Sequence, residues 1–515
     1  MSHVVSKVFS AELDGMSACP IEVEVDINIG LASFTIVGLG DKAVSEARER
    51  VSSALKNCDI KPPTRENRKI TVNLAPADIK KNGSQYDVSI ALGYLLASGQ
   101  ISPCETKQIL FVGELALSGD IRPVAGVFNI CRMAQERGFH TVFIPKDNAQ
   151  EAALADAITV VPVSHFKEII NYLESKSFKN NNCVKHSFKS DHSFSGVHIA
   201  DVCGQAHAKR ALTIAAAGGH NVFMYGPPGA GKTMLAQALI SILPPLALQE
   251  AIEATQLHSA AGLLLGKPYI SQRPFRSPHH TASLVSIIGG GQNPKPGEIS
   301  LAHTGVLFLD EIPEFHRDAL EALRQPLEEG RVVIARARRS IAYPARCILV
   351  AAANPCPCGY YGDSRKECVC TAFDIARYHK KLSGPLLDRI DLHVWVDRIQ
   401  SKDINHQGDA EETRLLRERV SQARDRAVSR FRYLHKNIFS NAALSSKDVS
   451  TCVAIDSRAK NLSQKLLDSG TLSARGYFRL IKVGQTIADL EGVDVVLEQH
   501  IAEAFSYRAR TNLSH

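Results

Sequence analysis

The most constraining feature of this 515-residue chain is an octapeptide that matches the phosphate-binding pattern G-x-x-x-x-G-K-[ST] at every fixed position. A strand-like apolar run, residues 221–225, precedes it, and a helix-forming segment, residues 234–240, follows it. Glycines let backbone N–H groups curl around an anion, and the following helix adds its positive N-terminal dipole. The octapeptide therefore predicts a triphosphate site formed by Gly226, Pro227, Pro228, Gly229, Ala230, Gly231, Lys232 and Thr233.

Two side chains of the loop and two carboxylates further along the chain have specific tasks in such a site. Lys232 is expected to reach the β- and γ-phosphates of ATP, and the Thr233 hydroxyl to bind Mg²⁺. Residues 305–309 form an apolar strand that ends in Asp310 and Glu311. Asp310 is predicted to hold the Mg²⁺ shell and Glu311 to polarise the attacking water. On its own, the same run could be a buried strand with an acidic, solvated end.

Composition excludes several classes of protein. The formal net charge of +7 permits nucleic-acid binding without requiring it. No run of about eighteen apolar residues is present, and the first residues lack the basic and apolar regions of a secretory signal. We therefore expect a cytoplasmic protein with no membrane partner. The twelve cysteines are then expected to be reduced thiols or metal ligands rather than disulfides.

Composition and periodicity divide the chain into four parts. Residues 1–175 alternate strand and helix patterns, as in an α+β or α/β domain. Residues 176–196 are polar and partly basic, which predicts a flexible linker. Residues 197–400 contain the phosphate loop. Residues 401–515 contain amphipathic helices and are predicted to form a separate C-terminal domain.

The first helix of that last part is predicted from about residue 412 to 432. Its apolar face is formed by Leu416, Val420, Ala423, Ala427 and Phe431. We expect its other faces to be solvated, as most basic helix faces are; they present Arg414, Arg417, Arg424 and Arg430.

Three later residues resemble nucleotide-sensing residues of AAA+ ATPases. Asn354 ends a second apolar strand and resembles sensor 1, which contacts the water or the γ-phosphate; the alternative is a turn residue ahead of a proline. Arg389 resembles the arginine finger that reaches a neighbouring subunit's nucleotide. The alternative is a salt bridge to Asp388 or Asp391. Arg475 begins a late helix and resembles sensor 2.

Residues 83–92 and 113–127 resemble the Lon protease fold, as it occurs in AAA-linked proteins. Lon proteases use a Ser–Lys dyad. On that pattern Gln85 stands at the serine position and Phe128 near the lysine, and neither an amide nor a phenyl ring can do that chemistry. We expect a domain without peptidase activity, kept for assembly or DNA contact. Ser84, one residue away, leaves an ATP-dependent protease of Lon type as an alternative.

Further along the chain, residues 289–303 resemble magnesium-chelatase-like AAA+ ATPases. With the Lon-like domain and residues 351–359, the chain resembles the ComM/YifB family over nearly its whole length. That resemblance implies a multidomain α/β fold: an N-terminal Lon-protease-like α+β domain, a central AAA+ domain with a parallel sheet and an insertion in its second helix, and a small helical C-terminal lid.

The same resemblance implies a homo-hexameric ring that binds single-stranded or branched DNA and acts as a branch-migration helicase on recombination intermediates in natural transformation. The alternative to such a motor is a metal-insertion ATPase subunit of magnesium-chelatase type.

Four cysteines form two C-x-C pairs in one short loop, with Cys356 and Cys358 followed by Cys368 and Cys370. Four thiolates so close together can form a tetrahedral site, so we expect structural Zn²⁺. The spacing is tighter than the commoner C-x₂-C. Four free thiols and an iron–sulfur cluster remain alternatives.

Basic residues in two segments are candidates for DNA contact. Residues 331–343 form a predicted hairpin in which Arg336 and Arg338 share one face and Arg339 lies at the tip. The alternative is an exposed, solubilising edge strand. Lys295, in the insertion, is a second candidate. Two histidines, His279 and His280, lack a spaced third metal ligand and are expected to be ordinary surface or turn residues.

Overall fold

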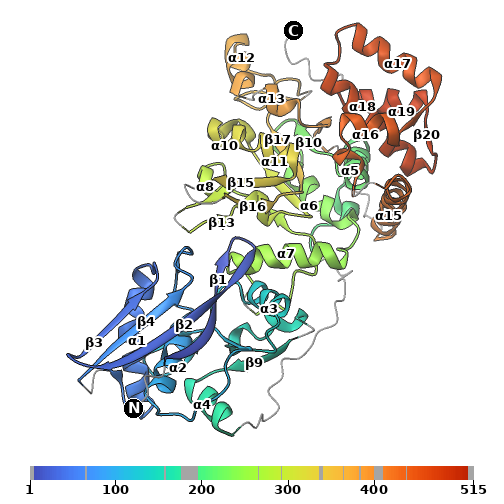
Figure 1. The fold of residues 1–515 in the computed structure, drawn as a ribbon. Coiled ribbons are helices and arrows are strands. Elements are labelled where there is room, and N and C mark those ends of the chain that lie inside the picture. The colour runs from blue at the N-terminus through green and yellow to red at the C-terminus, as the bar shows by residue number, and fades with distance from the viewer. Residues whose placement is uncertain are drawn as a thin grey trace.

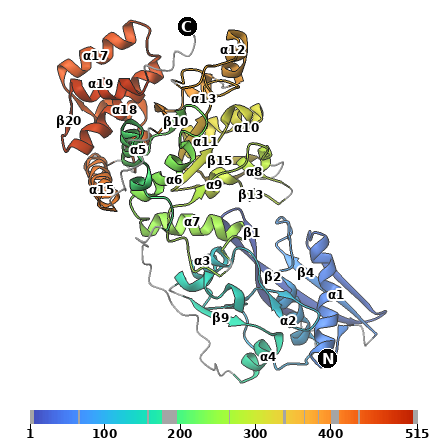
Figure 2. The ribbon, with the colours of Figure 1, turned by 180° about the vertical axis from the view of Figure 1, so that it is seen from behind.

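The computed structural model describes residues 5–63, 67–155, 158–175, 195–264, 266–291, 293–335, 340–363, 365–381, 384–399, 410–435 and 438–508. Figure 1 shows an N-terminal body in blue and teal, a central body in green and yellow, and a helical body in orange and red. The helix α7 (Leu248–Ala260) lies between the first two bodies, and Figure 2 shows the same arrangement from behind. This multidomain α/β architecture confirms the predicted fold class.

The N-terminal body is a mixed sheet covered by helices. In its described residues the sheet has seven strands in the order β3-β4-β2-β1-β5-β8-β9. Ile21, Val23 and Val25 of β2 are buried, while Glu22 and Glu24 between them are not, as the alternating pattern predicts. The strands are β1 (Ser6–Asp14), β2 (Ser17–Ile29), β3 (Ser33–Val37), β4 (Arg68–Ala75), β5 (Ile109–Phe111), β8 (Thr141–Pro145) and β9 (Thr159–Val163), and a small ladder joins β6 (Glu114–Leu115) to β7 (Ile121–Arg122). The helices are α1 (Lys42–Asn57), α2 (Asp87–Ala97), α3 (Val127–Glu136) and α4 (Phe166–Ser175), with short turns η2 (Lys146–Asn148) and η3 (Glu151–Leu154).

The central body has a parallel sheet that, among the described residues, has five strands in the order β11-β14-β17-β10-β18. Its central strands are apolar throughout because helices cover both faces. The strands are β10 (Val222–Tyr225), β11 (Phe275–Arg276), β14 (Val306–Leu309), β17 (Ile348–Ala353) and β18 (Leu392–Trp395). The helices are η4 (Ile199–Asp201), α5 (Ala206–Gly218), α6 (Lys232–Ile242), α7, η5 (Ile312–Glu314), α10 (Arg317–Ala322), α11 (Arg324–Glu329), α12 (Ala372–Lys381) and α13 (Gly384–Leu387).

Two antiparallel hairpins project from this body. The insertion between α7 and β14 contains β11, α8 (Leu284–Ile288), the pair β12 (Gly289–Gly290) and β13 (Lys295–Pro296), and α9 (Glu298–Leu301). The second hairpin pairs β15 (Arg331–Ala335) with β16 (Ser340–Pro344), which confirms the predicted hairpin. The predicted DNA-contact residues Arg336, Arg338 and Arg339 lie outside the described residues, as does most of the predicted linker.

The C-terminal body is helical, as predicted. It contains α15 (Ala410–Tyr433), η6 (Asn441–Ala443), α16 (Ser446–Cys452), α17 (Ser457–Asp468), α18 (Ala474–Glu491) and α19 (Glu498–Ser506), with a small ladder of β19 (Ala454–Ile455) and β20 (Val495–Val496). In the part of the chain that the structure describes, no helix combines the length and the apolar character that crossing a bilayer requires.

The predicted apolar face of α15 is confirmed, but the expectation that its arginines are solvated is wrong for three of the four. Arg417 and Arg424 donate to backbone carbonyls at the ends of α6 and α5, each at 2.8 Å. Arg430 pairs with the buried carboxylate of Asp489 on α18. Only Arg414 stays exposed. The helix is therefore fixed to the core by its basic side chains as well as by its apolar ones.

The N-terminal and central bodies meet where α3 and η3 lie against α7. The Gly126 N–H donates to the Ser259 carbonyl at 3.0 Å, and the Asn129 amide donates to the Gln256 carbonyl at 3.0 Å. The buried Glu151 carboxylate accepts a hydrogen bond from the Ser259 hydroxyl. These directional contacts, made by buried polar groups, fix how the two bodies sit on each other.

Replacing Glu151 should loosen this junction. Glu151→Ala removes the acceptor of the Ser259 hydroxyl and the Phe128 N–H, and one of the two acceptors of the Asn148 amide. Unsatisfied buried donors are costly, so we expect a loss of about 2–4 kcal/mol of unfolding free energy, measured by denaturant titration. The control Glu136→Ala removes an exposed pair and should change stability by less than about 1 kcal/mol. If both variants lost the same free energy of unfolding, the contacts of Glu151 at the junction would not be important for stability.

Candidate nucleotide site

The predicted phosphate loop lies between β10 and α6, where two glycines permit its shape. Gly231 caps the start of α6 with φ of 88°, a conformation that favours glycine. Gly226 lies against the Val396 carbonyl, so closely that no Cβ would fit there. The first N–H groups of α6 are thereby left at the loop, where an anion can accept from them.

Lys232 is held at the centre of the loop. Its ammonium donates to the carbonyls of Gly226 at 2.7 Å and Pro227 at 3.1 Å, and to Asn354 Oδ1 at 3.1 Å. Burial lowers the pKa of Lys232 to about 8, against the opposing attraction of Asp310 and Glu311. The residue expected to bind phosphates and the residue expected to sense them are therefore in direct contact.

The two residues predicted to bind Mg²⁺, Thr233 and Asp310, are also in contact. The Thr233 hydroxyl donates to Asp310 Oδ2 at 3.0 Å, although the two residues are 77 positions apart in the chain. Strands β14, β17 and β10 are parallel neighbours, so Asp310, Asn354 and the phosphate loop all follow strand ends at one edge of the sheet. Hydroxyl and carboxylate oxygens are the ligands that Mg²⁺ prefers. The residues present thus fit a nucleotide with its magnesium ion.

Glu311 has an unusual backbone and an unexpected neighbour. Its φ of 49° is left-handed, which is rare for a residue other than glycine, and its N–H donates to Asp310 Oδ1 at 2.9 Å. Its carboxylate lies 3.7 Å from Nδ1 of His280. The sequence predicts a surface or turn residue at His280, and the residue does lie in a turn. Nothing in the sequence indicates its contact with Glu311.

The two predicted arginines lie apart from this cluster. Arg389 is only 7% exposed, and its guanidinium pairs with Glu328 of α11 at 2.7 Å. Asp391, offered above as its alternative partner, pairs with Arg479 instead at 3.0 Å. Arg475 is exposed in the first turn of α18. The structure brings Lys232 and its partners together but leaves the roles of both arginines as predictions.

The four cysteines of the C-x-C pairs form one cluster, with all four sulfur atoms within 4.8 Å of one another. The Sγ atoms of Cys356 and Cys358 are 3.3 Å apart, and each lies 3.6 Å from Cys368 Sγ. Zn–S bonds of about 2.3 Å would place tetrahedral sulfurs about 3.8 Å apart. The N–H of Cys358 points at Cys370 Sγ at 3.4 Å. The donor set therefore fits a four-thiolate metal site.

The cysteine loop contacts the phosphate loop. Gly359 has φ of 85°, and a Cβ there would lie 2.8 Å from the Pro228 ring and 3.9 Å from the Asn354 side chain. Directly before the first cysteine, the Pro355 carbonyl is bonded to His379 of α12 at 2.8 Å. The cysteine cluster is thus joined to the sensing residue and to the phosphate loop through short stretches of backbone.

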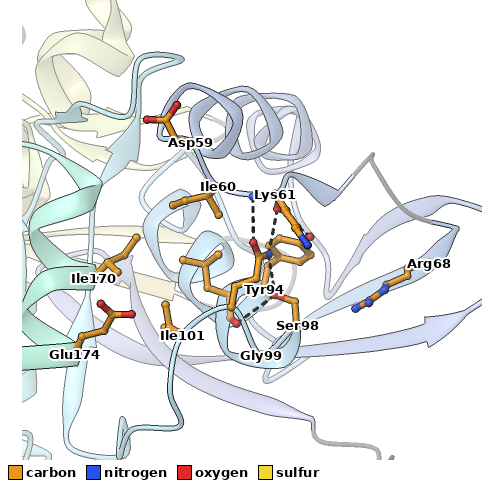
Figure 3. A pocket seen from close by; sticks show the side chains of 12 residues that line it. Asp59, Ile60, Lys61, Arg68, Tyr94, Ser98, Gly99, Ile101, Ile170 and Glu174 are labelled. Carbon is orange, nitrogen blue, oxygen red and sulfur yellow. Dashed lines mark hydrogen bonds between the residues drawn. The ribbon is translucent and has the colours of Figure 1, made fainter.

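Two of the cavities formed by the described residues lie in different bodies. One of about 390 Å³ adjoins the nucleotide site and is lined by Glu311, Asn354 and side chains of α12. The other, of about 550 Å³, lies in the N-terminal body beside α2. Figure 3 shows Lys61, Tyr94 and Ser98 along its wall. The Tyr94 hydroxyl and the Gln100 amide both donate to the Lys61 carbonyl at 3.2 Å, and the Gln100 amide also donates to Ser98 Oγ at 3.0 Å. No predicted site residue lines this second cavity.

The two residues at the catalytic positions of the Lon pattern, Gln85 and Phe128, lie in different surroundings. The Gln85 amide donates to Glu12 at 2.9 Å, and Phe128 is buried at the start of α3. Burial raises the pKa of Glu12 to about 7. The Ser84 hydroxyl donates to the Glu114 carboxylate. The absence of peptidase activity stays a prediction.

Of the DNA candidates, the structure describes Lys295, which is exposed on β13. The Tyr343 hydroxyl of β16 donates to the Pro294 carbonyl at 2.8 Å, and a Cβ on Gly289 would lie 3.3 Å from Ile334 of β15. The two hairpins are therefore packed side by side.

The site and the fold together define a P-loop ATPase of the AAA+ class. The features that define it are the phosphate loop, the paired carboxylates after β14, the asparagine after β17, and the helical body that follows the parallel sheet. Residues 198–404 match the family "Magnesium chelatase, subunit ChlI". Residues 23–148 match "Subunit ChlI of Mg-chelatase", and residues 410–508 match "Magnesium chelatase, subunit ChlI C-terminal".

Curated relatives match over nearly the whole chain, and two of them are described here. Competence protein ComM of Haemophilus influenzae is 42% identical over 98% of both chains. Protein YifB of Escherichia coli is 42% identical over 96% of this chain and 95% of its own length. A Lon protease of Brevibacillus choshinensis is 27% identical over 30% of this chain and 21% of its own. The chain belongs to the ComM/YifB family of magnesium-chelatase-like AAA+ ATPases.

Contact between the cysteine loop and the phosphate loop can be tested at Gly359. Gly359→Ala pushes a methyl group against Pro228, so we expect affinity for an ATP analogue to fall by about tenfold, a shift of roughly 1.4 kcal/mol, measured by fluorescence titration. Gly470→Ala is the matched control, because Gly470 has φ of 71° but no atom near its Cβ position. A similar loss in both variants would mean that backbone strain alone is responsible.

Proposed function

We propose that this chain is an ATP-hydrolysing motor that assembles as a homo-hexameric ring on single-stranded or branched DNA and drives branch migration of recombination intermediates. The observation that supports it most is the convergence of Lys232, Thr233, Asp310 and Asn354 at one edge of the parallel sheet. Full-length similarity to Competence protein ComM supports a role in natural transformation.

In the proposed reaction, a water molecule attacks the γ-phosphate in line. Glu311 and Asn354 orient that water, and Lys232 offsets charge on the transferring phosphoryl group. Magnesium held by Thr233 and Asp310 would neutralise further charge. Lys232, Asn354, Thr233 and Asp310 already contact one another at this edge of the sheet, so these four groups need little reorganisation when the nucleotide binds.

Assembly into a ring would complete the site. Arg389 would reach a neighbouring subunit's nucleotide only after leaving Glu328, so we expect ring assembly or nucleotide binding to open that ion pair. Arg475, exposed at the start of α18, is the proposed γ-phosphate contact within the same subunit. Both roles follow from the resemblance to AAA+ ATPases.

DNA contact is proposed at the two hairpins that lie side by side. Lys295 is exposed on one of them, and the arginines at positions 336, 338 and 339 belong to the other. A Cβ on Gly15, in the turn between β1 and β2, would lie 2.6 Å from Ile341 of β16. The N-terminal body thus contacts the hairpin pair, which favours a part for it in assembly or DNA contact.

A magnesium-chelatase-type subunit is the second candidate, supported by the descriptions of the matching families. Stimulation of ATP hydrolysis by a chelatase partner, rather than by DNA, would favour it. An ATP-dependent protease is the third candidate. Casein degradation that is lost in Ser84→Ala would favour that activity.

The central test is ATP hydrolysis and branch migration with and without forked DNA. We expect DNA to stimulate the wild type, Lys232→Ala to lose nucleotide binding, and Glu311→Gln to bind ATP while hydrolysing it ~10²-fold or more slowly. Lys380→Ala, an exposed lysine on α12, should behave as the wild type. A wild type that hydrolyses no ATP with any DNA would rule out the motor.

Zinc in the cysteine cluster is a separate proposal with its own test. Mass spectrometry of the purified chain should find about one zinc ion per chain, and Cys358→Ser should lose it and lower the melting temperature. Cys104 lies outside the cluster, so Cys104→Ser should keep the metal. Iron with visible absorption would instead indicate an iron–sulfur cluster.

A further inference from the structure

The backbone of Asn354 lies just beyond the end of the sheet. Its side-chain oxygen accepts from the Lys232 ammonium at 3.1 Å, so its NH₂ group is left as a donor for the attacking water or the γ-phosphate. Asn354 follows the last residue of β17, and Pro355 after it has no N–H to donate. The strand ladder therefore does not fix this backbone, and its position depends on contacts from another element.

The last turn of α12 supplies these contacts. His379 Nε2 bonds to the Pro355 carbonyl at 2.8 Å. The residue before it, Tyr378, is buried, and the backbone N–H of Asn354 faces its phenol oxygen. Two consecutive side chains of one helix thus lie against two consecutive residues of the segment that carries the sensing asparagine.

Tyr378 also lines the cavity beside the nucleotide site, together with Glu311 and Asn354. Burial and the carboxylate charges of Glu314 and Glu311 raise the pKa of Tyr378 to about 12. The phenol therefore keeps its proton at neutral pH, and its oxygen meets the Asn354 N–H as a neutral acceptor.

Helix α12 is itself fixed beside both strand ends. Lys381 pairs with Glu314 at 3.1 Å, and Glu314 is the last residue of η5, the turn that directly follows Glu311. Arg377 pairs within the helix, with Asp374 at 3.2 Å. The helix therefore joins the segment after β14 to the segment after β17, and these two segments carry the residues expected to orient the water.

We propose that Tyr378 is a positioning residue for ATP hydrolysis, whose phenol oxygen holds the Asn354 backbone so that the Asn354 amide stays directed at the attacking water. This role rests on the proposed hydrolytic site and adds a residue to it. Tyr378 acts through Asn354 rather than on the phosphates. Binding of ATP, which depends on the phosphate loop and Lys232, is then independent of the phenol.

Tyr378→Phe tests this role, because it removes one oxygen atom and keeps the buried ring. Loss of a single contact to a backbone N–H should lower kcat by about five- to tenfold. The KM for ATP and the affinity for an ATP analogue should stay within about twofold of the wild-type values, since the phosphate loop is unchanged. Steady-state kinetics and fluorescence titration measure the two effects separately.

Tyr361→Phe is the matched control. Tyr361 lies in the neighbouring cysteine loop, is 40% exposed and does not line the cavity, so the same loss of an oxygen atom should leave kcat at the wild-type value. An unchanged kcat in Tyr378→Phe, or an equal fall in Tyr361→Phe, would overturn the positioning role.

A second measurement separates positioning of Asn354 from a general loosening of the site. In an Asn354→Ala background, Tyr378→Phe should lower kcat no further, whereas a loss of packing lowers the rate in both backgrounds and would overturn the role.

His379 offers an independent check, which also serves if Tyr378→Phe does not fold. His379→Leu removes the bond to the Pro355 carbonyl and should lower kcat with little change in KM. His379→Gln keeps a donor for that carbonyl and should retain most of the rate. Equal losses in these two variants would contradict the anchoring of this backbone by α12.

Failure of the proposed function gives a different pattern when all variants are compared as full-length chains with and without forked DNA. If the wild type hydrolyses ATP but DNA stimulates neither hydrolysis nor branch migration, the motor fails, and the kcat values still decide the role of Tyr378. If DNA stimulates the wild type and Tyr378→Phe hydrolyses ATP at the wild-type rate, the motor stands and the role of Tyr378 is overturned.

Discussion

The nucleotide site depends on one buried ammonium group, that of Lys232. A buried cation is costly unless its hydrogen bonds are made, and here two loop carbonyls and the Asn354 amide oxygen accept them. This arrangement requires β10 and β17 to be parallel neighbours, because only then does Asn354 end beside the loop. The phosphates of a bound nucleotide would offer the same ammonium stronger, charged acceptors at the same edge of the sheet. The loop, the strand order and Asn354 thus depend on one another, because all three are needed to satisfy the hydrogen bonds of the Lys232 ammonium.

Features set by consecutive residues could be predicted from the sequence, and features set by packing between distant elements could not. The phosphate loop and its flanking strand and helix are local, and the edge rule for parallel strands then brings Asp310 and Asn354 to them. Residue type alone cannot tell a solvated arginine from a buried one. Arg424 is therefore predicted to be a solvated surface residue, but it donates to a backbone carbonyl of α5. Arg389 pairs with Glu328 of α11, which is distant from it in sequence. His280 has no sequence signal because its contact depends on how the insertion folds back.

The cysteine spacing can be seen in the sequence, but the position of the cysteine loop beside the phosphate loop comes from the fold. The two C-x-C pairs predict a metal site from sequence alone, but only the fold places Gly359 against Pro228 and Asn354. A metal bound to four thiolates would fix the loop's backbone within a few ångströms of the phosphate loop. Rigidity at that point favours a constant position for Asn354, which a residue that orients water needs. The metal's proposed part is therefore to hold geometry rather than to perform chemistry.

A buried network of hydrogen bonds connects the helical body to the segment that contains Arg389. His220 bonds to Asp391 at 3.1 Å and to Thr486 of α18 at 2.8 Å, and Arg479 of the same helix reaches Asp391 at 3.0 Å. Burial opposes ionisation of Asp391, yet the hydrogen bond from His220 and the nearby arginines hold its pKa below its usual range. Removing one partner from this network leaves a buried charge uncompensated, so the contacts are costly to break one at a time. Because Asp391 lies two residues after Arg389, a rotation of α18 acts directly on the backbone beside that arginine. The lid and the proposed contact with a neighbouring subunit are in this way mechanically joined within one chain.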